Sequence, residues 1–136
     1  MKKANVLKAL VAVATIFIGL TFTQCSSVDS QLKEVAKEMN DMCPMEMGGG
    51  VRLDKVTAES GKKLAMSMAV STIAANSSEA QMFTNMVKPM MVQSVKANNS
   101  PDYKKIKDMG VIFIFNFYDG EGVAICDVEL GPNDYI

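Results

Sequence analysis

The chain has 136 residues, of which 49% are hydrophobic and 21% are charged, a composition typical of one globular domain. Its formal net charge is −1, so it has no basic surplus with which to hold a nucleic-acid phosphate backbone. The sequence contains no histidine, which excludes histidine-based catalytic triads and histidine-based zinc sites.

Residues 1–24 have the pattern of a signal peptide. Lys2, Lys3 and Lys8 form a basic region ahead of an uncharged run from Ala9 to Phe22. As a helix that run would span about 21 Å, short of the roughly 30 Å hydrocarbon core of a bilayer. The sequence therefore predicts export to the cell envelope and not a permanent membrane helix.

The residues that follow, Phe22-Thr23-Gln24-Cys25-Ser26, resemble the lipobox of bacterial lipoproteins. That resemblance implies cleavage before Cys25 and acylation of its side chain. Residues 25–31 would then be a lipidated tether, and residues 32–136 a single domain. The alternative is ordinary secretion, with Cys25 as a spare thiol.

The first half of the domain shows a helix followed by a hairpin. Apolar residues at helical spacing predict a helix over residues 32–42, which Pro44 ends. The run Gly48-Gly49-Gly50 indicates a turn, because a phosphate-binding loop would need a Lys-Ser/Thr after its glycines. Alternating large side chains predict strands over residues 51–58 and 63–70.

The second half repeats that order with two helices before the hairpin. A capping box at Ser78-Glu79-Ala80-Gln81 opens the first helix, which should kink or restart at Pro89. Ser100-Pro101-Asp102 starts a short second helix that stops at Gly110. Strands are expected over residues 111–118 and 123–130. The first of these helices carries its apolar stripe at Met82, Phe83, Met86, Val87, Met90 and Met91.

The order α-β-β-α-α-β-β predicts an α+β fold. We expect an antiparallel four-stranded sheet made of two β-hairpins, with the helices packed on one of its faces.

Three separated segments together resemble a family. Asn40-Asp41-Met42-Cys43-Pro44, then Arg52-Leu53-Asp54-Lys55-Val56, then Gly110-Val111 leading into an aromatic strand and Asp119-Gly120, form a recognisable succession. It is similar to that of small bacterial envelope lipoproteins with an Asn-x-x-Cys-Pro motif after the first helix. The resemblance implies a place in the cell envelope and carries no known activity.

Five sulfur-bearing side chains lie within nine residues, beside the glycine run. Thioether and thiolate sulfur are ligands that suit Cu(I), so a Cu(I) site is one hypothesis. The alternative is core packing, because methionine is frequent throughout this chain. The residues concerned are Met39, Met42, Cys43, Met45 and Met47.

Cys43 and Cys126 are the two thiols left if Cys25 carries a lipid. An even number of cysteines in an oxidising compartment permits a disulfide between them. Two buried free cysteines that act as small apolar residues are the alternative, because alternation along a strand does not reveal the distance between the two Cα atoms.

Two charged groups have ordinary structural explanations. Asp119 and Glu121 lie in one turn, where Asp-Gly is expected from hairpin chemistry alone. A small basic patch on the short helix has the charge pattern of a solvated face. Its members are Tyr103, Lys104, Lys105 and Lys107.

We therefore expect a lipid-anchored protein of the bacterial cell envelope, facing the periplasm or the surface, without catalytic activity or a cofactor. Its expected partners are a membrane, through the N-terminal lipid, and an envelope protein or peptide, but no nucleic acid. The alternatives are a periplasmic Cu(I)-binding protein and an enzyme whose chemistry relies on carboxylates.

Overall fold

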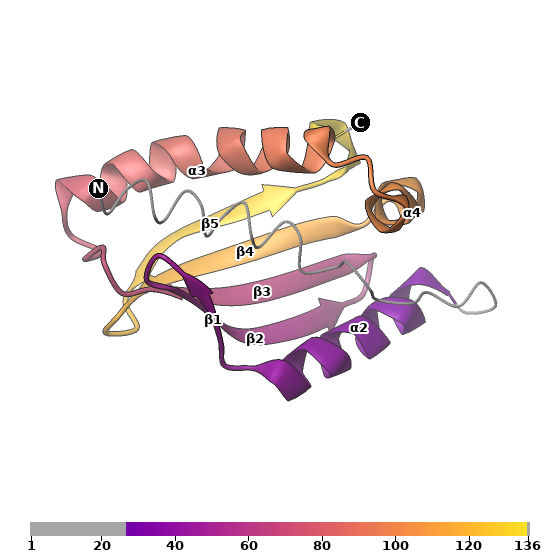
Figure 1. Cartoon of the computed structure of the whole chain (residues 1–136), viewed down its shortest axis with the longest axis horizontal. Coiled ribbons are helices and arrows are strands. Elements are labelled where there is room, and N and C mark those ends of the chain that lie inside the picture. Colours follow the sequence, from indigo (N-terminus) through magenta and orange to yellow (C-terminus); the bar gives the residue numbers. More distant parts are fainter. Residues whose placement is uncertain (1–26, 136) are drawn as a thin grey trace.

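The computed structural model describes residues 27–135, apart from the side chains of Asp102, Tyr103 and Ile106. The expected signal peptide and Cys25 lie outside the described residues. Helices flank a single sheet (Figure 1). In chain order the elements are α2 (Val28–Met42), β1 (Met45–Gly48), β2 (Val51–Glu59), β3 (Lys63–Val70), α3 (Ser78–Ala97), α4 (Pro101–Met109), β4 (Ile112–Asp119), β5 (Ala124–Leu130) and α5 (Pro132–Tyr135).

The sheet has five strands in the order β1-β2-β3-β4-β5. The two predicted hairpins, β2–β3 and β4–β5, are antiparallel, which confirms them. The expectation of a four-stranded, wholly antiparallel sheet is wrong, because β3 and β4 pair in parallel and β1 adds a fifth strand. The long connection through α3 and α4 returns the chain to the end of the sheet at which β3 began, and parallel pairing requires such a crossover.

The glycine run forms the turn that lets β1 pair with β2. Gly48, Gly49 and Gly50 all have positive φ, between 63° and 86°, which glycine adopts without strain. At Gly50 an added Cβ would lie 2.6 Å from the Thr72 methyl carbon, so the position also needs the absence of a side chain. The run is the turn that its sequence predicts, and it joins two strands where only one was expected.

α2 begins earlier than its apolar spacing predicts. The Oγ of Ser27 accepts a hydrogen bond from the backbone N–H of Ser30, so Ser27 is the N-cap. Residues 28–31, expected in the tether, form the first turn of the helix, and Gln31 is buried there. α2 thus begins directly after residue 27.

α3 runs without interruption through Pro89, where a kink or a restart was expected, so the helix does not restart there. Pro89 is exposed, so the carbonyl that loses its partner at this point faces the solvent side of the helix. At 20 residues α3 is the longest helix described. Across residues 27–135, no helix combines the length and the apolar character needed to cross a membrane.

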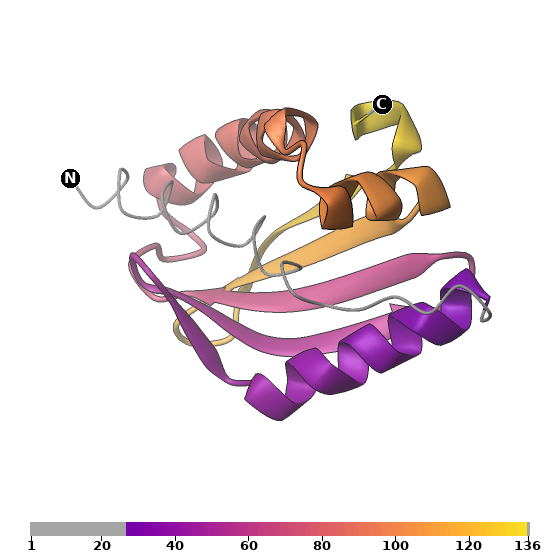
Figure 2. The same cartoon turned by 45° about the vertical axis from the view of Figure 1, so that its right-hand side comes forward.

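One face of the sheet carries the core. Met66 pairs with Phe115, and Phe115 pairs with Val128, so residues in register across three strands bury their side chains on the same side. α2 packs against β2 and α3 against β5 on this side, which confirms the expected one-sided arrangement (Figure 2). Phe83 of α3 contacts Phe117 with ring centroids 5.1 Å apart in an edge-to-face arrangement.

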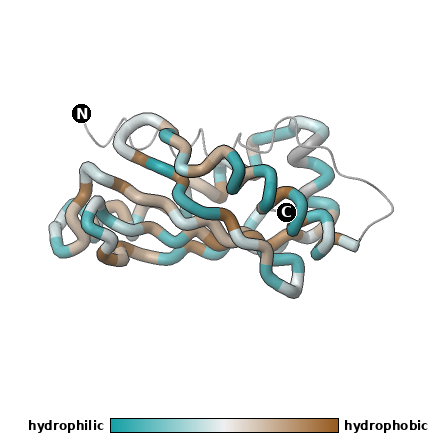
Figure 3. Tube along the Cα trace, turned by 90° about the horizontal axis from the view of Figure 1, so that it is seen from below, coloured by the Kyte–Doolittle hydropathy of each residue, from teal (hydrophilic) through white to brown (hydrophobic). Residues whose placement is uncertain are grey.

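The other face of the sheet is mixed in character. Small and polar residues of β3 alternate with the core residues, and Ser67 pairs there with Asn116. Ile114 and Tyr118 lie on the same side and are half-buried. Apolar and polar residues alternate along the strands, which form a layer below the helices when seen edge-on (Figure 3).

Candidate functional site

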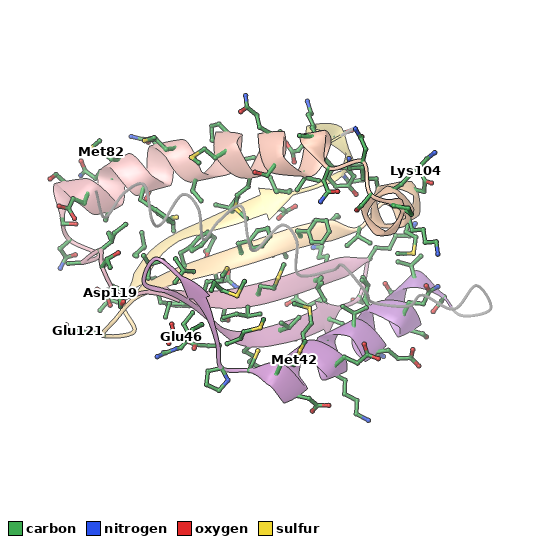
Figure 4. The ribbon with its side chains drawn as sticks, viewed as in Figure 1. Met42, Glu46, Met82, Lys104, Asp119 and Glu121 are labelled. Atoms are coloured by element: carbon green, nitrogen blue, oxygen red, sulfur yellow. The ribbon has the colours of Figure 1, made fainter. Side chains whose placement is uncertain are left out.

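The predicted copper ligands differ in their exposure to solvent. Met39 is fully buried in the core, whereas Met42 is 51% exposed at the end of α2 (Figure 4). Cys43, Met45 and Met47 are half-buried and pack against the core. The Sγ of Cys43 donates a hydrogen bond to the carbonyl of Met39 at 3.2 Å. Four of the five side chains therefore serve packing.

The chemistry of Cys43 also favours packing. Burial raises the pKa of its thiol, and the nearby charge of Asp54 raises this pKa further. The group is thus a protonated thiol near neutral pH, whereas Cu(I) binds the thiolate. Copper binding through Met39, Met42, Cys43, Met45 and Met47 stays a prediction.

The possible disulfide between Cys43 and Cys126 is not formed, because both thiols are free. Cys43 directly precedes β1 at one edge of the sheet, and Cys126 lies in β5 at the other edge. Three strands separate the two edges, and neighbouring strands lie about 4.8 Å apart. That separation exceeds the roughly 7 Å between Cα atoms that a disulfide permits.

Asp119 has a structural role in the turn after β4. Its carboxylate accepts hydrogen bonds from the backbone N–H groups of Val123, Glu121 and Ala75, at 2.9, 2.9 and 3.1 Å. These bonds, with that from Val123 the largest cause, lower the pKa of Asp119. Glu121 is exposed at the tip of the same turn (Figure 4). The carboxylate thereby joins the β4–β5 turn to the segment before α3.

The basic patch lies at the opposite end of the molecule from Asp119 (Figure 4). Lys104 and Lys105 are exposed, as a solvated face requires. Lys107 donates a hydrogen bond from Nζ to the carbonyl of Asn98 at 3.0 Å, which closes the connection between α3 and α4. Within the described part of the chain, no three His, Cys, Asp or Glu side chains are grouped so that they could hold a metal ion.

Asn40, the first residue of the Asn-x-x-Cys-Pro motif, binds the edge of β2. Its side-chain amide donates to the carbonyl of Val56 at 2.6 Å, and its Oδ1 accepts from the N–H of Val56 at 2.7 Å. β1 pairs only with the start of β2, so Asn40 takes the place of a strand neighbour further along. The motif therefore has a structural explanation.

The apolar pattern of α3 did not predict that a row of methionines on this helix reaches the surface. The buried stripe of this helix is Ala80, Phe83, Val87, Met91 and Val95. The predicted stripe is therefore confirmed at Phe83, Val87 and Met91 but not at its other three methionines. Met82 and Met86 are 45% and 44% exposed, and Met90 is half-buried. We call Met82, Met86 and Met90, spaced four residues apart, the methionine row.

The methionine row lies beside the buried stripe of α3. Phe83 points from α3 toward β4, where it meets Phe117. At 3.6 residues per turn, Met86 and Met90 lie roughly 60° and 20° around the helix from Phe83. Exposed methionines are common on surfaces that bind other proteins, since their flexible thioethers adapt to the partner.

Solved structures of other bacterial proteins share this fold. A candidate secreted protein from Pseudomonas aeruginosa matches with a TM-score of 0.63 and 18% identity, over 80% of this chain and 93% of its own. The type II secretion system pilotin AspS from Vibrio cholerae matches at 0.57 and 19%, over 79% and 91%. The pilotin EpsS of the Vibrio vulnificus type 2 secretion system matches at 0.59 and 14%, over 80% and 92%.

At these identities the likeness shows the fold alone. Neither a protein-family model nor a curated protein sequence matches the chain. The fold is thus one that two pilotins and a candidate secreted protein share, and the predicted export signal is consistent with that group.

Proposed function

We propose that this chain is a lipid-anchored accessory protein of the bacterial cell envelope that binds another envelope protein, as a pilotin of a secretion system does. The fold that it shares with two pilotins supports this proposal. Cys25 would carry the lipid. Asp119 and Cys43 both form structural hydrogen bonds, which favours a binding role over a catalytic one for this chain.

The observation that carries the proposal is the methionine row. Met82, Met86 and Met90 form an i, i+4, i+8 ridge about 12 Å long on α3. Ridges of this spacing pack into the groove of a second helix. The partner element that fits is an amphipathic helix with an apolar face, and burial of a methionine side chain stabilises a complex by about 1.5–3 kcal/mol at most.

Site-specific photocrosslinking in intact cells tests the proposal. A photoreactive amino acid replaces Met86 in the full chain, and a second variant carries it at Thr57, an exposed residue of β2. The proposal predicts one discrete adduct with an envelope protein from position 86 and none from position 57. In that adduct the crosslinked residue of the partner should lie on the apolar face of a helix.

Substitution separates a specific contact from proximity. Met82→Lys should remove the adduct formed at position 86, whereas Thr57→Lys should leave it unchanged. Equal adducts from positions 86 and 57, or an adduct at 86 that Met82→Lys does not weaken, would contradict binding at the methionine row. Circular dichroism of both lysine variants checks that each still folds.

A further inference from the structure

We propose that the free edge of β5 binds an extended segment of a protein partner, in which apolar residues alternate with lysine or arginine, as an added strand. This surface is separate from the methionine row and goes beyond the function proposed above. Three features of the described residues carry the inference: an unpaired strand edge, a small cavity on its helix side and two carboxylates on its other side.

The two edges of the sheet differ. At one edge β1 has only four residues and an irregular register, and beyond it the amide of Asn40 occupies the N–H and carbonyl of Val56. At the other edge β5 has seven residues and, among the strands of the described chain, pairs only with β4. An edge strand directs alternate N–H and C=O groups outward, which a further strand can pair with. The edge at β1 and β2 therefore offers few backbone groups to a further strand, whereas the edge at β5 offers a row of them.

A cavity of about 280 Å³ lies where α3 passes over β5. Phe83 points inward to β4, and Gln81 and Asn85 lie roughly 160° around the helix from it, on the outer flank. Because Ile125 of β5 also lines it, the cavity lies beside this edge strand. Its volume is below the range of about 300–1,000 Å³ typical of small-molecule sites, and it suits a single apolar side chain better. Its lining residues are Ala75, Ala80, Gln81, Thr84, Asn85 and Ile125.

Two exposed carboxylates lie on the other side of β5. Asp127 and Glu129 are in register with Asn116 and Ile114, which places them on the sheet face opposite the core. A strand added about 4.8 Å away would bring its side chains within reach of these carboxylates at every second residue. Basic residues at those positions complement the charge, and the residues between them face the cavity.

The same carboxylates disfavour a second copy of this chain as the occupant. In an antiparallel pair of two β5 strands, Asp127 and Glu129 of each copy would lie near those of the other. Like charges placed opposite one another destabilise a strand pair. The charge on this edge therefore favours a partner of opposite sign.

Hydrogen exchange with a synthetic peptide tests the inference. The full chain in non-ionic detergent is mixed with a peptide in which valine and lysine alternate. We expect the amides of β5 to exchange more slowly in the complex and those of β2 to be unchanged. A matched peptide of the same composition, with all valines before all lysines, should bind at least tenfold more weakly. So should an alternating peptide that is N-methylated at every second residue, because it lacks donors for the strand edge.

Charge variants complete the test. Asp127→Asn together with Glu129→Gln should weaken binding about three- to tenfold, the range expected for two exposed ion pairs. Asp41→Asn and Glu38→Gln, at two exposed positions of α2, should leave the affinity for the peptide unchanged. Equal affinity of the N-methylated peptide, unchanged exchange at β5, or a dimer formed through β5 would each overturn the inference. A failed methionine-row experiment would not affect it, since Met82 and Met86 are not part of this edge.

Discussion

Single polar side chains join parts of this molecule that are distant in the sequence. Asn40 connects α2 to β2, and Asp119 connects the β4–β5 turn to the segment before α3. Asp29 accepts a hydrogen bond at 2.8 Å from the backbone N–H of Lys62, which attaches the β2–β3 turn to the first turn of α2. In each case a side chain satisfies backbone groups that the sheet leaves unpaired.

Replacement of Asn40 by alanine should lower the free energy of unfolding by about 1–3 kcal/mol, because the N–H and carbonyl of Val56 both lose their partner. Asp41→Ala, at the adjacent exposed position, is the control and should change little. Urea titrations of both variants measure the difference. A loss for Asn40→Ala no larger than that for Asp41→Ala would show that the bidentate contact is not important for stability.

Asp119 predicts an acid-dependent loss of stability. Its pKa is lowered in the folded state, so its contribution is complete above the unfolded pKa of about 3.9 and is lost as the pH falls through the folded value. Asp119→Asn should therefore lower the thermal midpoint at pH 7, and the difference from wild type should shrink as the pH falls below about 4. Thermal unfolding from pH 7 to pH 2 checks this. Glu121→Gln, at the exposed tip of the turn, should follow the wild type.

At the scale of elements, the short helix α5 closes the open end of the core. The Tyr135 hydroxyl donates a hydrogen bond at 2.6 Å to the carbonyl of Val111. The ring of Tyr135 packs edge-to-face against that of Phe113, with the ring centroids 6.3 Å apart. Asp134 accepts from the N–H of Gly131 at 2.8 Å, which holds the turn between β5 and α5. These contacts hold the four-residue helix α5 in place at the end of the sheet.

Tyr135 predicts an alkaline transition. Burial raises the pKa of Tyr135 to about 12, so the contribution of the protonated hydroxyl is complete below the unfolded pKa of about 10 and is lost as the pH rises toward 12. Tyr135→Phe should lower the free energy of unfolding by about 1 kcal/mol at pH 8. Urea titrations at pH 8 and pH 11.5 should show that this difference narrows. Tyr118→Phe, on the open face, is the control for loss of a phenol.

α3 shows why an apolar pattern alone does not identify the core face of a helix. Two stripes are available on it, one through Met82, Met86 and Met90 and one through Ala80, Phe83 and Val87. Both satisfy helical spacing. The contact of Phe83 with Phe117 selects the second stripe, and the methionines are left at the surface.

At the scale of the whole molecule, the proposed lipid anchor at Cys25 would set the position of the domain relative to a membrane. α2 begins at Val28, three residues after this cysteine in the sequence. A lipid on Cys25 would therefore hold the domain close to the membrane surface, with its first helix beginning next to the anchor.

Metabolic labelling with a fatty-acid analogue tests the anchor. Wild-type chain should be labelled and found in the membrane fraction, and Cys25→Ala should be unlabelled. Cys43→Ala and Cys126→Ala are matched controls that should retain the label, since both thiols lie within the folded domain. Equal labelling of wild type and Cys25→Ala, or none of either, would return the chain to the class of secreted proteins without an anchor.

Local features of this protein follow from its sequence because they depend on neighbours in the chain. Helices at 32–42 and from 78, the two hairpins and the glycine turn depend on periodicity, capping and the conformational freedom of glycine. The structural role of Asp119 was also expected from its turn. The motif Asn40 to Pro44 was recognised, although its contact with Val56, 16 residues away, was not.

Only the tertiary structure decided how these elements pair. Whether β3 and β4 are parallel depends on the path of α3 and α4, and strand alternation is the same for either direction. The separation of Cys43 from Cys126 depends on the order of the strands in the sheet. The exposed methionine row and the open edge of β5 depend on which neighbours are present. Local patterns determine elements, whereas distances between elements arise when their apolar faces are buried together.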